Sequence, residues 1–203
     1  RYPKKIIKNI YNVPMIEHVR RRAKLSKNLI EVYVATNSEI ISNIIKNNDG
    51  KVVITKKKHH NGTSRCSEAI KNIDCTHAII IQGDEALLFP RHINKLTKKI
   101  FEKMEIKVWN AVGDLINKNE LDKKTFVKCS IQSNNKINYI FRRSPAFSPF
   151  DSQKKYIKKI LGILAFKKNT LIQYPRIKKS IVEKQEFIEQ MSILHNNIDI
   201  YSV

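Results

Sequence analysis

Cysteine is scarce in this 203-residue sequence. Its three cysteines, Cys66, Cys75 and Cys129, are an odd number and show no C-x-x-C spacing. This pattern argues against a disulfide-stapled scaffold and against a structural zinc site. It is typical of a protein from a reducing compartment, so we expect a cytoplasmic location.

Long apolar runs are also missing. No stretch approaches the roughly 18 to 20 residues that a membrane-spanning helix requires. The chain starts at Arg1-Tyr2-Pro3 without a charged-then-apolar secretion leader. Because we find no internal repeat and no low-complexity linker, we expect residues 1–203 to form one domain that has no membrane partner.

Arginine is the minority among the basic residues. The formal net charge is +21, but 30 of the 39 basic residues are lysine, spread through a chain rich in Ile and Asn. Such a bias explains the charge without a nucleic-acid partner, and no aromatic residues interleave a basic patch. We interpret Arg20-Arg21-Arg22 as a solvated face. A nucleic-acid-binding protein remains an alternative that rests on net charge alone, whereas attraction of small anions is expected.

Apolar strand patterns alternate with helical patterns along most of the chain. This alternation predicts an α/β fold with a mostly parallel sheet covered by helices on both faces. Ser38 is the expected N-cap of one helix, and Pro90 the first residue of another. The predicted helices are 14–26, 38–45, 64–72 and 90–103, and the predicted strands are 32–36, 51–55, 78–82, 108–112 and 160–166.

The region after Phe126 has a different pattern. Residues 126–131 and 137–141 alternate around Asn134-Asn135, which predicts an antiparallel hairpin. Residues 182–194 carry apolar side chains at helical spacing and predict one amphipathic helix.

The segment Ala78-Ile79-Ile80-Ile81-Gln82-Gly83-Asp84-Glu85 carries the clearest chemical signal. Its four apolar residues predict a strand buried on both faces. A glycine then permits a turn, and two carboxylates follow where ligands bind in open α/β sheets. A carboxylate there suits a divalent metal held against nucleotide phosphates. From these residues alone, an acidic turn without a ligand is an equally good interpretation.

Three further clusters carry polar or cationic groups. His59 to Arg65 lie between a strand and a helix, where backbone N–H groups suit an anionic ligand. The cations of Arg1-Tyr2-Pro3-Lys4-Lys5 precede the first helix, and Arg142-Arg143-Ser144 follow a strand. Taken singly, the last two are an exposed terminus and a basic turn.

In their order, these segments match a known family. The chain resembles the sugar-activating cytidylyltransferases, most closely those that act on 3-deoxy-manno-octulosonate. The matching segments are R-x-P-x-K at Arg1–Lys5, P-M-I-x-H-V at Pro14–Val19, V-x-V-A-T at Val32–Thr36, H-x-x-G-T-x-R at His59–Arg65, Q-G-D-E at Gln82–Glu85, F-x-R-S at Phe141–Ser144, G-I-x-A-F at Gly162–Phe166 and E-x-x-E-x-I-E-Q at Glu183–Gln190.

The resemblance implies a Rossmann-like nucleotidyltransferase fold and a cytoplasmic, dimeric enzyme of bacterial lipopolysaccharide synthesis. Such an enzyme transfers CMP from CTP to an acidic sugar and releases pyrophosphate. It implies that residues 126–141 and 182–194 are the dimer and sugar-side elements. The implied roles are catalysis by Asp84, Lys5 and Arg1, Mg²⁺ binding by Asp84, nucleotide binding by Arg1, Lys5, Gly62, Thr63, Ser64 and Arg65, and sugar binding by Gln82, Arg143, Glu189 and Gln190.

Departures from the family pattern leave the sugar open. Ile160 and Leu164 replace a histidine and a tyrosine that lie near the sugar in the resembled enzymes, so another acid such as an acylneuraminate is an alternative. An I-P-A-R strand before Arg1 and a second metal carboxylate after Val203 are also missing. We therefore expect a chain truncated at both ends, with part of its phosphate and metal site absent.

Overall fold

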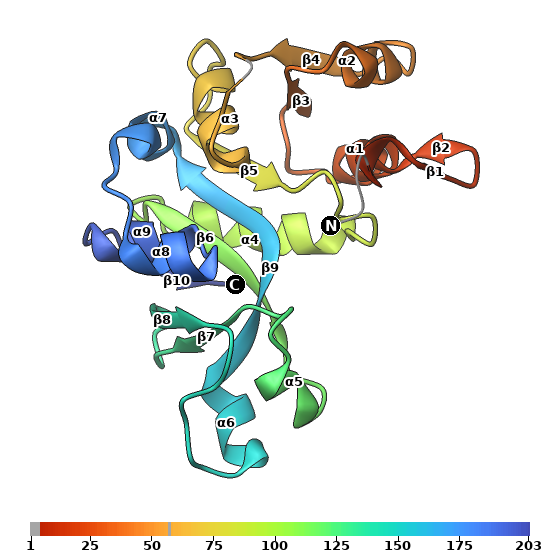
Figure 1. The fold of residues 1–203 in the computed structure, drawn as a ribbon. Helices are drawn as coiled ribbons and strands as arrows, with labels where there is room; N and C mark the ends of the chain where they lie inside the picture. The colour runs from red at the N-terminus through yellow and green to blue at the C-terminus, as the bar shows by residue number, and fades with distance from the viewer. Residues whose placement is uncertain (1–4, 57) are drawn as a thin grey trace.

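A computed structural model describes residues 5–56 and 58–203, which form a mixed sheet covered by helices, beside two smaller strand pairs, β1–β2 and β3–β4 (Figure 1). No helix in this described part is long and apolar enough to cross a membrane. In chain order the elements are η1 (Lys5–Ile7), β1 (Asn9–Ile10), β2 (Val13–Pro14), α1 (Met15–Lys24), β3 (Tyr33–Thr36), α2 (Glu39–Lys46), β4 (Lys51–Ile54), α3 (Gly62–Ala69), β5 (His77–Ile81), α4 (Pro90–Glu102), β6 (Val108–Asp114), α5 (Asn119–Asp122), β7 (Lys128–Ile131), β8 (Ile137–Phe141), α6 (Phe150–Tyr156), β9 (Ile157–Lys167), α7 (Lys168–Gln173), η2 (Tyr174–Arg176), α8 (Ile181–Glu186), α9 (Gln190–His195) and β10 (Ile200–Ser202).

The main sheet has the strand order β10-β6-β9-β7-β8, with β5 also paired to β9. Strand β10 runs parallel to β6, whereas β9 runs antiparallel to β5, β6 and β7. The α/β fold is thus confirmed, but the sheet is mixed rather than mostly parallel. The reason is that the long strand β9 lies in the middle of the sheet and runs in the direction opposite to β5, β6 and β7.

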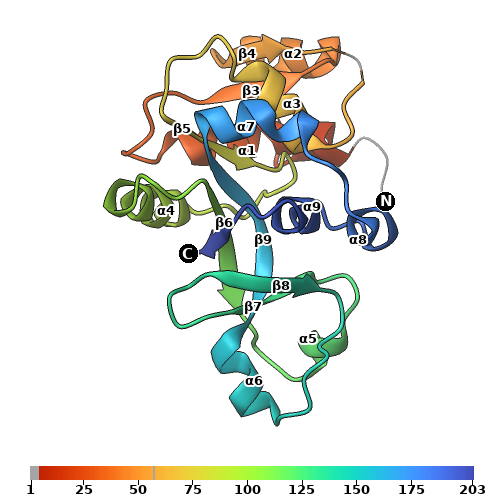
Figure 2. The same ribbon diagram turned by 90° about the vertical axis from the view of Figure 1, so that its left-hand side faces the viewer.

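Strand β9 joins two regions of the molecule (Figure 2). Its second half lies between β5 and β6, and its first half pairs with β7. The predicted hairpin at 126–141 is confirmed as β7 and β8, with Asn135 in the left-handed region at φ 67°. The amide side chains of asparagine tolerate that conformation in turns.

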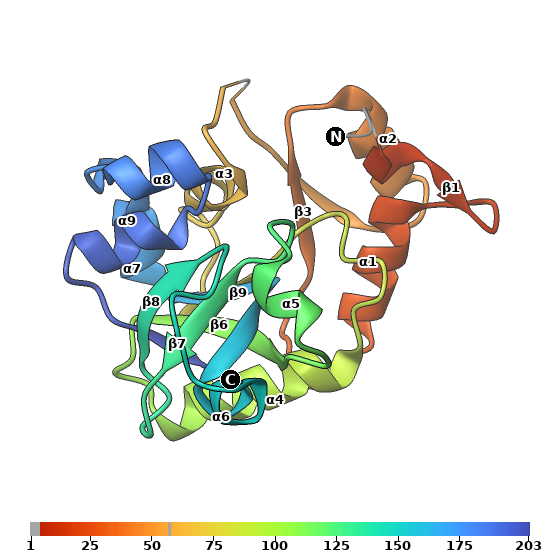
Figure 3. The same ribbon diagram turned by 60° about the horizontal axis from the view of Figure 1, so that its bottom comes forward.

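Strands β3 and β4 form a separate parallel pair connected by α2. The predicted cap is confirmed, since Ser38 Oγ accepts a hydrogen bond from the N–H of Ile41. Figure 3 shows this pair and α1 on one side of the molecule, with α3, α7, α8 and α9 on the other.

Strand β5 faces the space beside β3. Among the described residues it pairs only with β9, so its other edge stays open to that space. Ala78 and Ile80 pack in one core and Ile79 and Ile81 pack against the other, so both faces of the strand are covered, as expected. Ile80 is buried and the other four residues are partly buried.

Two cores cover the opposite faces of the main sheet. Successive residues of β9 alternate between them, as the period of two along a strand requires. Ile163 and Ala165 pack toward α1 and α4, whereas Leu164 and Phe166 pack toward α7 and α9.

The predicted single helix at 182–194 was wrong, because the chain forms two short helices there. Phe187 adopts a left-handed conformation at φ 56° and ends α8, and its N–H bonds to the carbonyl of Glu183. This break places Glu189 and Gln190 at the start of α9.

The interpretation of Arg20-Arg21-Arg22 as a solvated face was wrong for Arg20. That side chain is only 7% exposed and forms two hydrogen bonds to the fully buried carboxylate of Glu17. It also donates to the carbonyl of Asn48, so the group joins α1 to the residues after α2.

Candidate active site

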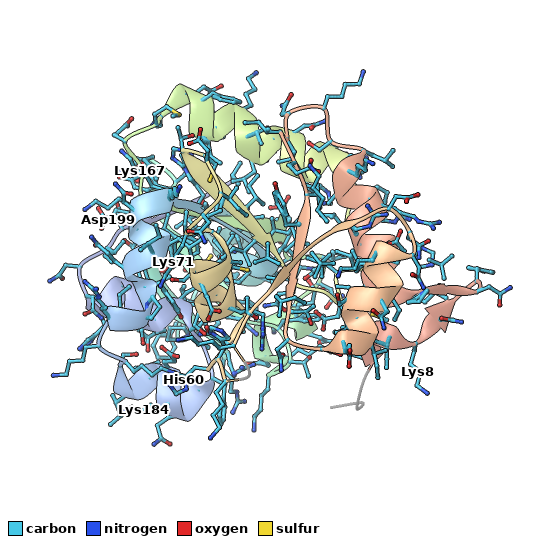
Figure 4. All side chains as sticks on the ribbon, turned by 90° about the horizontal axis from the view of Figure 1, so that it is seen from above. Lys8, His60, Lys71, Lys167, Lys184 and Asp199 are labelled. Carbon is cyan, nitrogen blue, oxygen red and sulfur yellow. The ribbon has the colours of Figure 1, made fainter. Side chains whose placement is uncertain are left out.

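A cavity of about 1610 Å³ lies between the β3 side of the molecule and the main sheet. Typical ligand pockets measure roughly 300 to 1,000 Å³, so this cavity is larger than a site for one small ligand requires. Its polar lining comes from segments far apart in sequence. Figure 4 shows His60, which precedes α3, and Lys184 of α8 on the same side of the molecule, and both line the cavity.

Lys5 and Asp84 form an ion pair in this cavity, and both side chains are partly exposed. Lys5 begins η1, and Asp84 follows the end of β5. A cation and a carboxylate from two segments far apart in sequence are thus brought together at the cavity. Arg1 lies outside the described residues.

Gly83 has a different purpose from the one that the sequence indicated. No glycine in the described residues has a positive φ. A Cβ at Gly83 would instead lie 2.8 Å from Cδ1 of Ile16. The glycine therefore lets the carboxylate segment pack closely against α1.

The segment Gly62 to Arg65 begins α3, two residues earlier than predicted. Gly62, Thr63 and Arg65 line the cavity, whereas Ser64 does not. Ser64 is engaged with Asn61 in a reciprocal capping box, in which Asn61 Oδ1 accepts from the Ser64 N–H at 2.8 Å. The Asn-x-x-Ser spacing is the signal that sequence reasoning missed.

Glu85 also lines the cavity, although the sequence indicated no role for it. Its Oε1 accepts a hydrogen bond from the N–H of Gly162 on β9, at 3.1 Å. A Cβ at Gly162 would overlap this carboxylate, so the contact requires glycine there. Burial raises the pKa of Glu85 despite that hydrogen bond, and the charge of Asp84 adds to the rise.

The expected sugar-binding residues Gln82, Glu189 and Gln190 also line the cavity. Glu189 Oε1 accepts a hydrogen bond from the hydroxyl of Thr63, at 3.1 Å. Burial raises the pKa of Glu189, although the Thr63 hydrogen bond opposes the rise. A carboxyl that stays neutral at higher pH can donate a hydrogen bond to an anionic ligand.

Arg143 lies apart from these residues. It does not line the cavity, and its Nε is 3.9 Å from Oδ1 of Asp122, with both side chains about two-thirds exposed at 67% and 69%. Its role toward a sugar carboxylate stays a prediction.

We expect Glu189→Gln to change the pH dependence of stability. A raised native pKa means that the folded chain holds this proton more tightly than the unfolded chain, so wild-type stability falls as pH rises above the unfolded value. The variant lacks this loss. Its melting temperature relative to wild type should therefore rise as the pH increases above the ordinary carboxyl value of 4.5.

The control for this experiment is Glu186→Gln, at a carboxylate that is 52% exposed on α8. The melting-temperature difference of the control from wild type should not change with pH. A difference for Glu189→Gln that is equally flat would contradict the prediction.

The carboxylates fit a divalent metal only in part. The described residues contain no group of three His, Cys, Asp or Glu side chains able to hold a metal ion. Mg²⁺, however, is commonly held by one or two carboxylates together with substrate phosphates and water. Asp84 is 29% exposed at the cavity and meets that lesser requirement.

Comparison with known proteins identifies the family. The cytidylyltransferase family profile matches residues 1–200. A 3-deoxy-manno-octulosonate cytidylyltransferase of Fusobacterium nucleatum is 34% identical over 197 residues, which are 97% of this chain and 80% of the relative. An 8-amino-3,8-dideoxy-manno-octulosonate cytidylyltransferase of Shewanella baltica is 32% identical over 199 residues, covering 96% and 80%.

Solved structures agree with this match. CMP:2-keto-3-deoxy-manno-octonic acid synthetase complexed with CTP has a TM-score of 0.92 at 27% identity, over 100% of this chain and 83% of that one. The inositol-1-phosphate CTP transferase from T. maritima shares the fold, with a TM-score of 0.65 at 17% identity over 98% and 75%. The fold and the cavity thus define an α/β nucleotidyltransferase. More narrowly, the chain belongs to the cytidylyltransferase family and is a CTP-dependent enzyme.

Proposed function

We propose that this enzyme transfers the cytidylyl group of CTP to 3-deoxy-manno-octulosonate, for bacterial lipopolysaccharide synthesis. The anomeric hydroxyl attacks the α-phosphorus, a P–O bond forms, and the bond to the leaving pyrophosphate breaks. The hydroxyl proton passes to solvent. One observation supports the proposal best: a single cavity joins the Lys5–Asp84 pair to Glu189 and Gln190, in a chain 34% identical to an enzyme with that name.

The residues act by positioning and by charge. In our proposal Lys5, together with Arg1, neutralises the triphosphate, and the α3 start at Gly62 and Thr63 holds the cytidine side with Arg65. In-line transfer to phosphorus depends mainly on such alignment and on stabilising charge at the phosphate oxygens. Gln82, Glu189 and Gln190 face the sugar, and Arg143 remains the proposed partner of its carboxylate.

Asp84 is the proposed protein ligand of Mg²⁺. When bound, the ion would neutralise negative charge on the phosphate oxygens. Before that, Asp84 is paired with Lys5. In this proposal, the side chains of Lys5 and Asp84 both lie where the phosphates of CTP bind.

The acceptor side of the cavity is partly apolar. Ile160 and Leu164 both line it, at the positions where the sequence departs from the family pattern. Relatives that act on the 8-amino sugar are also 32% identical, so that sugar is a second candidate acceptor. Net charge remains the sole support for a nucleic-acid binder, and the comparisons do not favour an acylneuraminate enzyme.

The test is pyrophosphate release from CTP and Mg²⁺ in the presence of 3-deoxy-manno-octulosonate, its 8-amino analogue or N-acetylneuraminate. We expect release with the first acceptor, and with CTP in preference to ATP. Release with the 8-amino sugar alone would reassign the acceptor. No release with any acceptor, together with salt-sensitive DNA binding, would sink the enzymatic proposal.

We also propose a cytoplasmic homodimer that forms through the hairpin β7–β8 and the α8–α9 region. Exposed apolar side chains on both support this, since Tyr139 is 45% and Phe187 80% exposed. A mass in solution of twice 23.7 kDa is expected. The mass of a single chain would contradict it.

A further inference from the structure

Asn110 is a fully buried polar residue on β6 that does not line the cavity. It stands at an irregularity in the β6–β9 pairing. Asn110 pairs with Leu164 and Val112 pairs with Ile160, so Ala111 alone faces the three β9 residues between them. Such bulges leave backbone N–H and C=O groups without their usual hydrogen-bond partners on the neighbouring strand. They are common next to active sites.

The side chain of Asn110 satisfies backbone carbonyls at this bulge. Its Nδ2 donates to the carbonyl of Ala111 at 2.8 Å and to that of Leu161 at 3.1 Å. Carbonyls only accept hydrogen bonds, so the amide nitrogen must face them. The amide oxygen of Asn110 therefore has to point the other way.

That oxygen meets the side chain of Gln190. Gln190 Nε2 donates to Asn110 Oδ1 at 3.1 Å, and Gln190 is itself only 7% exposed. Because Asn110 Oδ1 can only accept, the orientation of the second amide is fixed as well. Among the described residues, Gln190 Oε1 has no hydrogen-bond donor, and Gln190 lines the cavity.

We propose that Asn110 is a positioning residue that fixes Gln190 so that its Oε1 faces the acceptor sugar. This rests on the proposed function, in which Gln190 belongs to the sugar side. The cavity then offers the sugar a hydrogen-bond acceptor at this point. The matching substrate group is a donor, and a hydroxyl of the polyhydroxy acid supplies it.

The arrangement also explains the role of the bulge. The opposite side of the same three β9 residues is held by Glu85, which accepts from Gly162, and by Gln82, whose N–H donates to the Gly162 carbonyl. Asn110 and the segment after β5 thus contact the irregular part of β9 from two sides.

The test is a double-mutant cycle of wild type, Asn110→Leu, Gln190→Met and the double variant. Asn110→Leu keeps a similar volume but removes the oxygen that orients Gln190. We expect it to raise the KM for 3-deoxy-manno-octulosonate by about 3- to 10-fold, the effect of one hydrogen bond, with the KM for CTP changed less than about twofold. The double variant should match the more impaired single variant, because Asn110 acts through Gln190.

Additive effects of the two substitutions would overturn the proposal, as would an unchanged sugar KM in Asn110→Leu. Should Asn110→Leu not fold, as judged by its melting curve, Asn110→Ser takes its place. Its hydroxyl still donates to a carbonyl but is too short to reach Gln190. Calorimetric titration of the same sugar in the presence of CMP should give the same ranking. A wild type that neither binds nor turns over the sugar would instead overturn the proposed function.

Discussion

Asp84→Asn should lower kcat/KM for CTP-dependent pyrophosphate release by about 10² to 10⁴-fold. The substitution keeps the size of the side chain but removes the only charge on the proposed metal ligand. An amide cannot hold a divalent cation against phosphates as a carboxylate does, and metal-based charge stabilisation is worth several kcal/mol. The ion pair with Lys5 is lost as well, but both partners are partly exposed, so little stability should go with it.

Three measurements make this experiment specific. Raising the Mg²⁺ concentration should partly restore the rate, because the defect is in metal affinity. The melting temperature should stay close to that of wild type. As the matched control, Asp151→Asn removes an exposed carboxylate on α6, 83% exposed in its pair with Lys154, and should leave the rate unchanged. A turnover of Asp84→Asn within tenfold of wild type would remove Asp84 from the proposed mechanism.

Glu17→Ala should destabilise the fold by about 3 to 5 kcal/mol. Glu17 is fully buried and receives two hydrogen bonds from Arg20 and one from Arg21, each at 2.7 Å. Its removal leaves the buried Arg20 guanidinium without its carboxylate, which is costly in a dry environment. For a chain of this length, the melting temperature should fall by about 6 to 20 °C.

The pH dependence of that loss gives a second check. Burial by itself raises the pKa of Glu17, but the hydrogen bonds and charges of Arg20 and Arg21 outweigh it and lower the pKa below 4.5. The stabilisation is therefore present above 4.5 and disappears as the pH falls through the lowered native value, so the variant should approach wild type in acid. In contrast, Glu102→Ala removes a 39% exposed partner of Lys99 and should leave the melting temperature nearly unchanged. Equal losses in both variants would refute the buried role of Glu17.

The local elements were predictable because each depends on neighbours in sequence. The Ser38 cap, the proline that opens α4, and the apolar strands β3, β4, β6 and β9 follow from side-chain chemistry over a few residues. So does the hairpin at Asn135, where the turn chemistry is local. Motif order likewise identified the family and the candidate carboxylate Asp84.

The pairing of strands and the partners of buried polar groups were decided only by tertiary structure. The antiparallel course of β9, the break of the late helix at Phe187 and the burial of Arg20 depend on segments that meet from afar. The same holds for Glu85 on Gly162 and for Asn110 on Gln190, 77 and 80 positions apart.

Sequence by itself determined which chemistry this chain carries: a carboxylate after β5, a cation before the first helix, and Glu189 with Gln190 late in the chain. Only the folded structure decided that Lys5 meets Asp84, that Thr63 meets Glu189, and that Gln190 is oriented by a buried asparagine. The physical reason is that hydrogen bonds and ion pairs act over a few ångströms in space. Local sequence patterns depend on spacing along the chain. They do not indicate which residues of distant segments come into contact in the folded protein.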